Sequence, residues 1–97
     1  KKVDYVIANG IFNVKLKTEV TDWKKYILDT VLDLNKYASK GFSFNILTSY
    51  SDEEHKKEYL HYANPLEIFD FCKKNISRNV SLLHDYNLYE FTIIVRK

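Results

Sequence analysis

The sequence predicts a two-layer α+β fold, with two to three helices on one face of a mostly antiparallel sheet. Three observations predict it: an Asn-Gly pair between two alternating apolar runs near the start of the chain, two stretches with apolar residues at helical spacing, and a final stretch that alternates again. A chain of 97 residues with 45% hydrophobic and 29% charged side chains is expected to form a single domain over residues 1–97.

The first sheet element is predicted to be an N-terminal β-hairpin. Asn9-Gly10 is the pair that two-residue type I′ turns prefer. Folding the chain about this turn places Tyr5 opposite Val14 and Ile7 opposite Phe12, which directs one apolar face to the core. The other face of the hairpin then carries mainly lysine and asparagine.

A helix and a middle strand are predicted to follow. Thr21 or Asp22 can cap the helix, its apolar positions from Trp23 onward step by three and four residues, and Gly41 is expected to end it. Residues 42–49 then alternate between apolar and uncharged polar side chains, which predicts a half-buried strand.

Two helix-start signals lie in the second half of the chain. Ser51-Asp52-Glu53-Glu54 has the spacing of a capping box and predicts a short, solvated helix from Asp52 to Tyr62. Asn64 can cap a second helix with Pro65 at its first position. This helix is expected to bury Ile68, Phe69, Cys72 and Ile76.

The last two segments complete the predicted sheet. Residues 80–84 are either a brief strand or the tail of the preceding helix, and periodicity does not decide between them. Residues 89–96 alternate, with Ile94 adding an apolar side chain to the second face, which suits a central strand. The core-facing aromatic side chains are expected to be Tyr5, Phe12, Phe42, Phe44, Tyr89 and Phe91. The uncovered sheet face is expected to carry Lys2, Asp4, Asn13, Lys15, Lys17, Ser43, Asn45, Ser49, Glu90, Thr92 and Arg96.

Composition favours a cytoplasmic protein. No apolar run approaches the ~20 residues of a membrane-spanning helix, and no basic-then-apolar leader opens the chain. Cys72 is the single cysteine, so no intrachain disulfide can form. Asn-x-Ser sequons at Asn75 and Asn79 leave secretion open. Because the chain begins with Lys1 and contains no methionine, we expect it to be a trimmed or processed piece of a slightly longer protein.

Several kinds of site are disfavoured. Two glycines cannot form a glycine-rich phosphate loop, and a single cysteine excludes cysteine-paired zinc sites. Glu54, Glu58 and His61 have helical metal-ligand spacing, but a solvated helix face explains them better. Cys72, His84 and Asp85 supply thiol-site residue types, yet Cys72 lies on an apolar stripe and is expected to be inert. We therefore expect no catalytic residues, no metal and no cofactor.

The leading hypothesis is a small non-enzymatic protein that acts through protein–protein contact. Tyrosine is enriched in interfaces because it offers a large, stiff, amphipathic surface. The bias towards lysine, asparagine, isoleucine and tyrosine indicates an AT-rich genome, which suggests a phage or mobile-element regulator or inhibitor. Tyr86 and Tyr89 offer further tyrosine surface near a late turn. The proposed contact surface consists of Tyr50, His55, Tyr59, His61 and Tyr62.

Two alternatives remain open at this stage. The net charge of +2 is too small to imply a polyanionic partner by itself. A nucleic-acid-binding module could still use phosphate contacts from the lysine-bearing sheet face and the first helix, namely Lys2, Lys15, Lys17, Lys24, Lys25 and Arg96. A metal-dependent enzyme is the third possibility. The sequence gives no partner identity and no oligomeric state.

Overall fold

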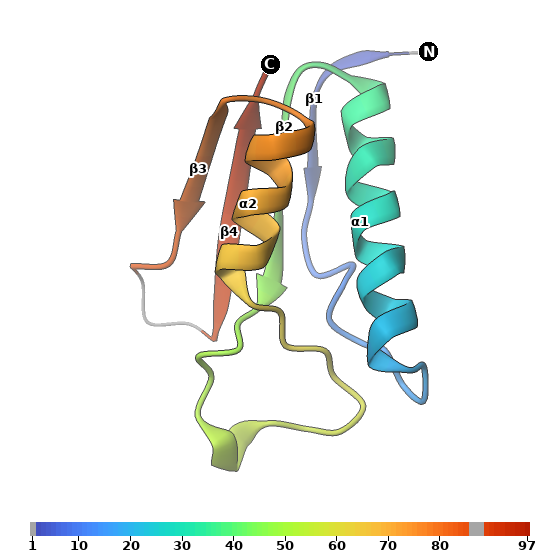
Figure 1. The fold of residues 1–97 in the computed structure, drawn as a ribbon, viewed down its shortest axis with the longest axis vertical. Helices are drawn as coiled ribbons and strands as arrows, with labels where there is room; N and C mark the ends of the chain where they lie inside the picture. Colours follow the sequence, from blue (N-terminus) through green and yellow to red (C-terminus); the bar gives the residue numbers. More distant parts are fainter. Residues whose placement is uncertain (1, 86–88) are drawn as a thin grey trace.

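The computed structural model describes residues 2–85 and 89–97, which form a four-stranded mixed sheet with two α-helices packed on it. The predicted two-layer α+β class is therefore confirmed (Figure 1). In chain order the elements are β1 (Val3–Ala8), α1 (Val20–Tyr37), β2 (Ala38–Leu47), the short 3₁₀ helix η1 (Glu53–His55), α2 (Pro65–Asn75), β3 (Asn79–Leu83) and β4 (Glu90–Arg96). The strands lie in the order β1-β2-β4-β3.

The N-terminal hairpin is not present. β1 pairs in parallel with β2, with Val6 opposite Phe42 and Ala8 opposite Phe44, and α1 connects the two strands. The residues after Gly10 do not return along β1, because Phe12 is instead fully buried in the core, where its ring meets the ring of Phe44 edge-on. Burying this phenylalanine between α1 and β2 takes the place of the cross-strand contacts that the hairpin would have made.

The first helix forms as predicted but has different ends. α1 begins at Val20, and neither Thr21 nor Asp22 caps it, since Glu19 holds the N-cap position without a side-chain hydrogen bond. It ends at Tyr37, and β2 begins at once with Ala38. Gly41 consequently does not end the helix and lies inside β2, between Tyr5 of β1 and Arg96 of β4.

The remaining strands confirm the predicted alternation of apolar and polar side chains. In β2 the side chains of Phe42, Phe44 and Ile46 are buried, as predicted. β4 is a central strand that pairs antiparallel with β2 on one side and with β3 on the other. Residues 79–83 form the strand β3, which decides between the two alternatives for this segment.

The segment between β2 and α2 is mostly irregular. The predicted helix from Asp52 to Tyr62 is wrong, because only Glu53–His55 forms a single 3₁₀ turn. The rest of the segment bonds to other loops instead, as when the amide of His61 donates to the carbonyl of Asn13 at 2.7 Å. α2 begins as predicted, with Asn64 Oδ1 accepting a hydrogen bond from the Leu66 amide at 2.9 Å.

Both helices cover the same face of the sheet (Figure 1). Ile27 and Val31 of α1 and Ile68 and Cys72 of α2 pack on the buried residues of β2 and β4. The opposite sheet face has no covering element within the described residues, and it carries the predicted polar side chains Ser43, Asn45, Thr92 and Arg96.

The side chains of β1 face opposite to the prediction. Tyr5 and Ile7 are 65% and 74% exposed on the uncovered face, while Val6 and Ala8 face the helices. Without the hairpin, parallel pairing with β2 sets which residues point inward. Tyr89 is also 46% exposed rather than core-facing. Tyr86, named above as possible contact surface, lies outside the described residues.

No helix among the described residues is both long enough and apolar enough to cross a membrane.

Candidate functional site

The side chains with the most potential for ligand contact lie at one edge of the sheet. β1, β2 and β3 all run towards this edge and β4 starts from it, so four chain segments meet there (Figure 1). In sheets built from parallel β-α-β units, ligands bind beyond the carboxyl ends of the strands. The loops of residues 9–19 and 48–64 extend from this edge.

Asparagines fix the loop after β1. Asn45 Oδ1 accepts a hydrogen bond from the amide of Gly10 at 2.7 Å, and Asn13 Oδ1 accepts one from the amide of Leu47 at 3.0 Å. Gly10 has a φ of 71°, a conformation that glycine adopts without strain. The side chain of Asn9, at the end of β1, is exposed and makes no hydrogen bond to any described residue. Asn9 is thus held in place by its neighbours and available to a ligand.

A threonine–histidine pair lies at the ends of β2 and β3. Thr48 Oγ1 and His84 Nε2 are 2.9 Å apart, and Thr48 Oγ1 also accepts a hydrogen bond from the Tyr50 amide at 3.2 Å. His84 Nδ1 is buried and has no hydrogen-bond partner in the described part of the chain. When the ring proton is on Nε2, Nδ1 carries a lone pair that no described residue uses.

A second polar cluster lies around Tyr89. Its hydroxyl donates to Asp52 Oδ2 at 2.9 Å, and this hydrogen bond raises the pKa of Tyr89 above its ordinary value. The ring of His55 lies 5.6 Å from the ring of Tyr89. A cavity of about 180 Å³ adjoins this cluster, lined by Leu47, Ser51, His55, Leu60, Tyr62 and Tyr89.

Comparison with known proteins gives one informative similarity. All 97 residues of the chain are 53% identical to part of a Mycobacterium tuberculosis protein named "Putative methyltransferase Rv1506c". The chain spans 58% of the length of that relative. No protein-family model matches the chain, and no solved structure matches it.

This similarity corrects the functional hypothesis drawn from the sequence. Identity of 53% over the whole chain to a protein named as a methyltransferase points to an enzyme, so the expectation of a non-enzymatic binding protein is wrong. The expectation of a phage or mobile-element regulator or inhibitor is wrong for the same reason. A non-enzymatic nucleic-acid-binding module is corrected to an enzyme in the same way, while contact with nucleic acid stays a prediction.

The proposed contact residues do not form one surface. His61 is only 3% exposed, whereas Tyr50 and Tyr59 are 68% and 52% exposed. Tyr62 is half-buried, and its hydroxyl accepts a hydrogen bond from the amide of Lys57. His55 is exposed on η1. The expected helix that would have aligned these side chains is absent, and contact with a protein partner stays a prediction.

The basic residues of the alternative hypothesis are also dispersed. Lys2 and Arg96 lie at the opposite edge of the sheet from Lys15 and Lys17, since Lys2 precedes β1 and Arg96 ends β4. Two others are already in ion pairs, Lys24 with Glu67 at 3.7 Å and Lys25 with Asp29 at 2.7 Å.

The residues considered as metal ligands or as a thiol site are also not arranged as a site. Glu58 and His61 are not on a helix, and His61 is buried while Glu58 is exposed. Asp52, Glu54 and His55 bring ligand atoms within 4.8 Å of one another, but all three are exposed and Asp52 already accepts the Tyr89 hydroxyl. Cys72 is fully buried, and burial raises the pKa of its thiol to about 12, which leaves it unreactive at neutral pH.

Asn9, Asn13 and Thr48 were not identified from the sequence. Asn9 and Thr48 directly follow the ends of β1 and β2, which is the signal that marks the ligand edge of a parallel sheet, and Asn13 lies in the loop after β1. The hairpin interpretation concealed this signal, because it made Asn9 a turn residue and Asn13 part of a second strand.

Proposed function

We propose that this chain forms part of the catalytic domain of a methyltransferase and supplies one section of its ligand-binding edge. The observation that carries the proposal is the 53% identity over all 97 residues to a protein named as a methyltransferase. At that level of identity over a whole domain-sized segment, fold and site architecture are expected to be shared. The activity of the complete protein is part of the proposal, since the chain spans 58% of the relative.

The geometry of the sheet supports the proposal. The β1-α1-β2 unit is a parallel pair with its connecting helix, its carboxyl edge carries Asn9 and Thr48, and His84, which follows β3, contacts Thr48 there. A methyltransferase brings an activated methyl donor, such as S-adenosylmethionine, next to a nucleophilic acceptor. Asn9 offers an exposed carboxamide that can donate and accept hydrogen bonds.

The cavity beside Tyr89 does not by itself enclose a nucleoside-type donor. The cavity beside Tyr89 measures about 180 Å³, which is below the size of ordinary cofactor pockets of about 300–1,000 Å³. The sheet also has an uncovered face on which Tyr5 and Ile7 are exposed. We propose that additional polypeptide covers this face in the complete enzyme and contributes the rest of the donor site.

A chimera tests the proposal. The 97 residues of this chain would replace the matching segment of the Mycobacterium tuberculosis relative, and binding of S-adenosylhomocysteine would be measured by calorimetry. We expect the chimera to bind with a dissociation constant within about tenfold of that of the relative. Asn9→Ala should weaken binding by about tenfold, because a buried donor group of the ligand loses its partner.

Asn79→Ala is the matched control, because Asn79 is an exposed asparagine at the opposite edge of the sheet and its loss should leave binding unchanged. A chimera that unfolds cooperatively but fails to bind S-adenosylhomocysteine would overturn the proposal, whether or not the relative binds it.

We also propose a cytoplasmic location. The single cysteine, Cys72, is fully buried and free, which is compatible with a reducing compartment.

A further inference from the structure

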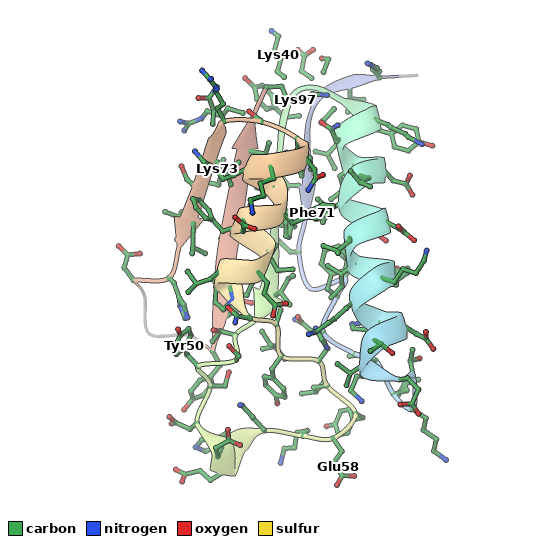
Figure 2. All side chains as sticks on the ribbon, viewed as in Figure 1. Lys40, Tyr50, Glu58, Phe71, Lys73 and Lys97 are labelled. Atoms are coloured by element: carbon green, nitrogen blue, oxygen red, sulfur yellow. The ribbon has the colours of Figure 1, made fainter. Side chains whose placement is uncertain are left out.

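A pocket of about 240 Å³ lies between the two helices, on the face of the sheet away from the exposed side chains of Tyr5 and Ile7. Its apolar walls are formed by Ile27 and Leu28 of α1 and by Ile68 and Phe71 of α2. Phe71 extends from α2 towards α1, as Figure 2 shows. An engineered apolar cavity of about 150 Å³ is large enough to bind benzene, so this pocket has room for a slightly larger ring.

One polar side chain at the pocket lacks a partner. His61 lines the pocket, is only 3% exposed, and its ring makes no hydrogen bond to any described residue. Its backbone is fixed, because its amide donates to the Asn13 carbonyl at 2.7 Å. A ring held in this way can hydrogen-bond a ligand that enters the pocket.

The charges nearest to His61 are positive. Burial lowers the pKa of His61 below its ordinary value, and the nearby charges of Lys24 and Lys15 lower it further. The imidazole is therefore neutral at pH 7 and can donate one hydrogen bond.

The acidic residues of the pocket rim are already paired with cations. Glu67 lies 3.7 Å from Lys24, and Asp70 lies 3.2 Å from Lys74. These side chains are all at least half exposed, so they can move aside when a ligand enters.

We propose that this pocket binds a small monocarboxylate with one aromatic or aliphatic ring, with its ring between α1 and α2 and its carboxylate at His61 and Lys24. The apolar walls select the ring, the volume limits the ligand to about one ring, and Lys24, which also lines the pocket, favours the negative charge once Glu67 has moved aside. The pocket lies between the helices rather than at the strand edge, so this inference does not depend on methyl transfer.

Benzoate is the probe that tests the inference on the chain as it stands. The histidine ring signals would be followed by NMR while benzoate, benzylamine or acetate is added. We expect benzoate to bind with a dissociation constant of about 1 mM or tighter. Benzylamine, which reverses the charge, and acetate, which lacks the ring, should each bind at least about tenfold more weakly. Bound benzoate should also raise the pKa of His61, because a nearby carboxylate favours the protonated ring.

Variants locate the site. His61→Phe keeps a ring in the pocket but removes the hydrogen bond, and should weaken benzoate binding by about tenfold. His55→Phe is the matched control, since His55 is exposed on η1 and should not affect binding. If His61→Phe does not fold, Leu28→Trp, which fills the pocket from α1, is expected to abolish binding. Equal binding of benzoate and benzylamine, or benzoate binding that survives both pocket variants, would overturn the inference.

Discussion

Two titratable side chains in the core respond to burial in opposite directions. Burial raises the pKa of Cys72 to about 12 and lowers the pKa of His61. The cause is the same, because removal from water disfavours the charged form, which is the thiolate for cysteine and the imidazolium for histidine. Both groups are therefore neutral at pH 7. The thiol makes no reactive site, whereas the imidazole keeps two nitrogens that can bond to a ligand.

His61 should make folding stability depend on pH. Since its pKa is lower in the folded chain than the ordinary 6.5, the unfolded chain binds more protons as the pH falls through 6.5. The free energy of unfolding should therefore decrease as the pH is lowered from 7.5 to 5.5, by at most about 1.4 kcal/mol per pH unit from this one group. Urea unfolding at each pH measures this free energy.

The control for this prediction is again the pair of histidine variants. His61→Phe should flatten the dependence between pH 7.5 and 5.5, while His55→Phe should not change it, because His55 is exposed. If the free energy of unfolding depended on pH equally in wild type and His61→Phe, His61 would not be the source of the dependence.

At the scale of elements, local signals predicted the second helix and the strands with clear alternation. Asn64 caps α2 through its side chain, and Phe42, Phe44 and Ile46 point inward from β2. These features depend on residues near one another in sequence. The partner of β1 could not be predicted in this way, because parallel pairing with β2 joins residues more than thirty positions apart. The preference of Asn9-Gly10 for a hairpin turn is smaller than the gain from burying Phe12.

The ligand edge was missed for the same reason. Asn9, Thr48 and His84 come to the same end of the sheet only after β1, β2 and β3 are aligned in one direction, which no local pattern specifies, and of the three only Thr48 and His84 are in contact. The capping-box spacing at residues 51–54 also predicted a helix that does not form. Ser51 instead donates its hydroxyl hydrogen to the Thr48 carbonyl at 2.7 Å and is buried, so it is not free to cap.

Gly41 lies inside β2 at a point where the backbone of β4 approaches closely. A Cβ at this position would lie 2.5 Å from the Val95 carbonyl oxygen, which belongs to the backbone of β4 and cannot move aside. Gly41→Ala should therefore lower the free energy of unfolding by about 2 kcal/mol through overpacking. Urea unfolding measures this loss.

Ser43→Ala provides the comparison for Gly41→Ala, since it lies two residues further along β2 on the same face and should change stability by less than about 0.5 kcal/mol. If Gly41→Ala were as stable as Ser43→Ala, the close approach of β2 and β4 at this position would be incorrect.

At the scale of the whole molecule, the sheet is covered on one face. Parallel strands usually occur in sheets covered on both faces, yet Tyr5 and Ile7 of the parallel strand β1 are 65% and 74% exposed. β1 is also an edge strand within the described residues, with β2 as its one neighbour. An exposed apolar edge strand is a template for association with further polypeptide. This agrees with the proposal that the chain is one section of a larger enzyme.

The uncovered face should contribute to association but little to the stability of the chain alone. Replacing both Tyr5 and Ile7 by threonine keeps strand propensity but removes the exposed apolar surface. We expect the free energy of unfolding to change by less than about 1 kcal/mol, because neither side chain is buried. Self-association at high concentration, measured by sedimentation velocity, should decrease because the apolar patch is lost.

Ile27→Thr is the buried counterpart of this double variant. It removes a side chain that is 1% exposed in the core and should lower the free energy of unfolding by about 2–3 kcal/mol. A double variant as unstable as Ile27→Thr would mean that Tyr5 and Ile7 are covered within the folded chain, and an additional covering layer would then have no free surface to occupy.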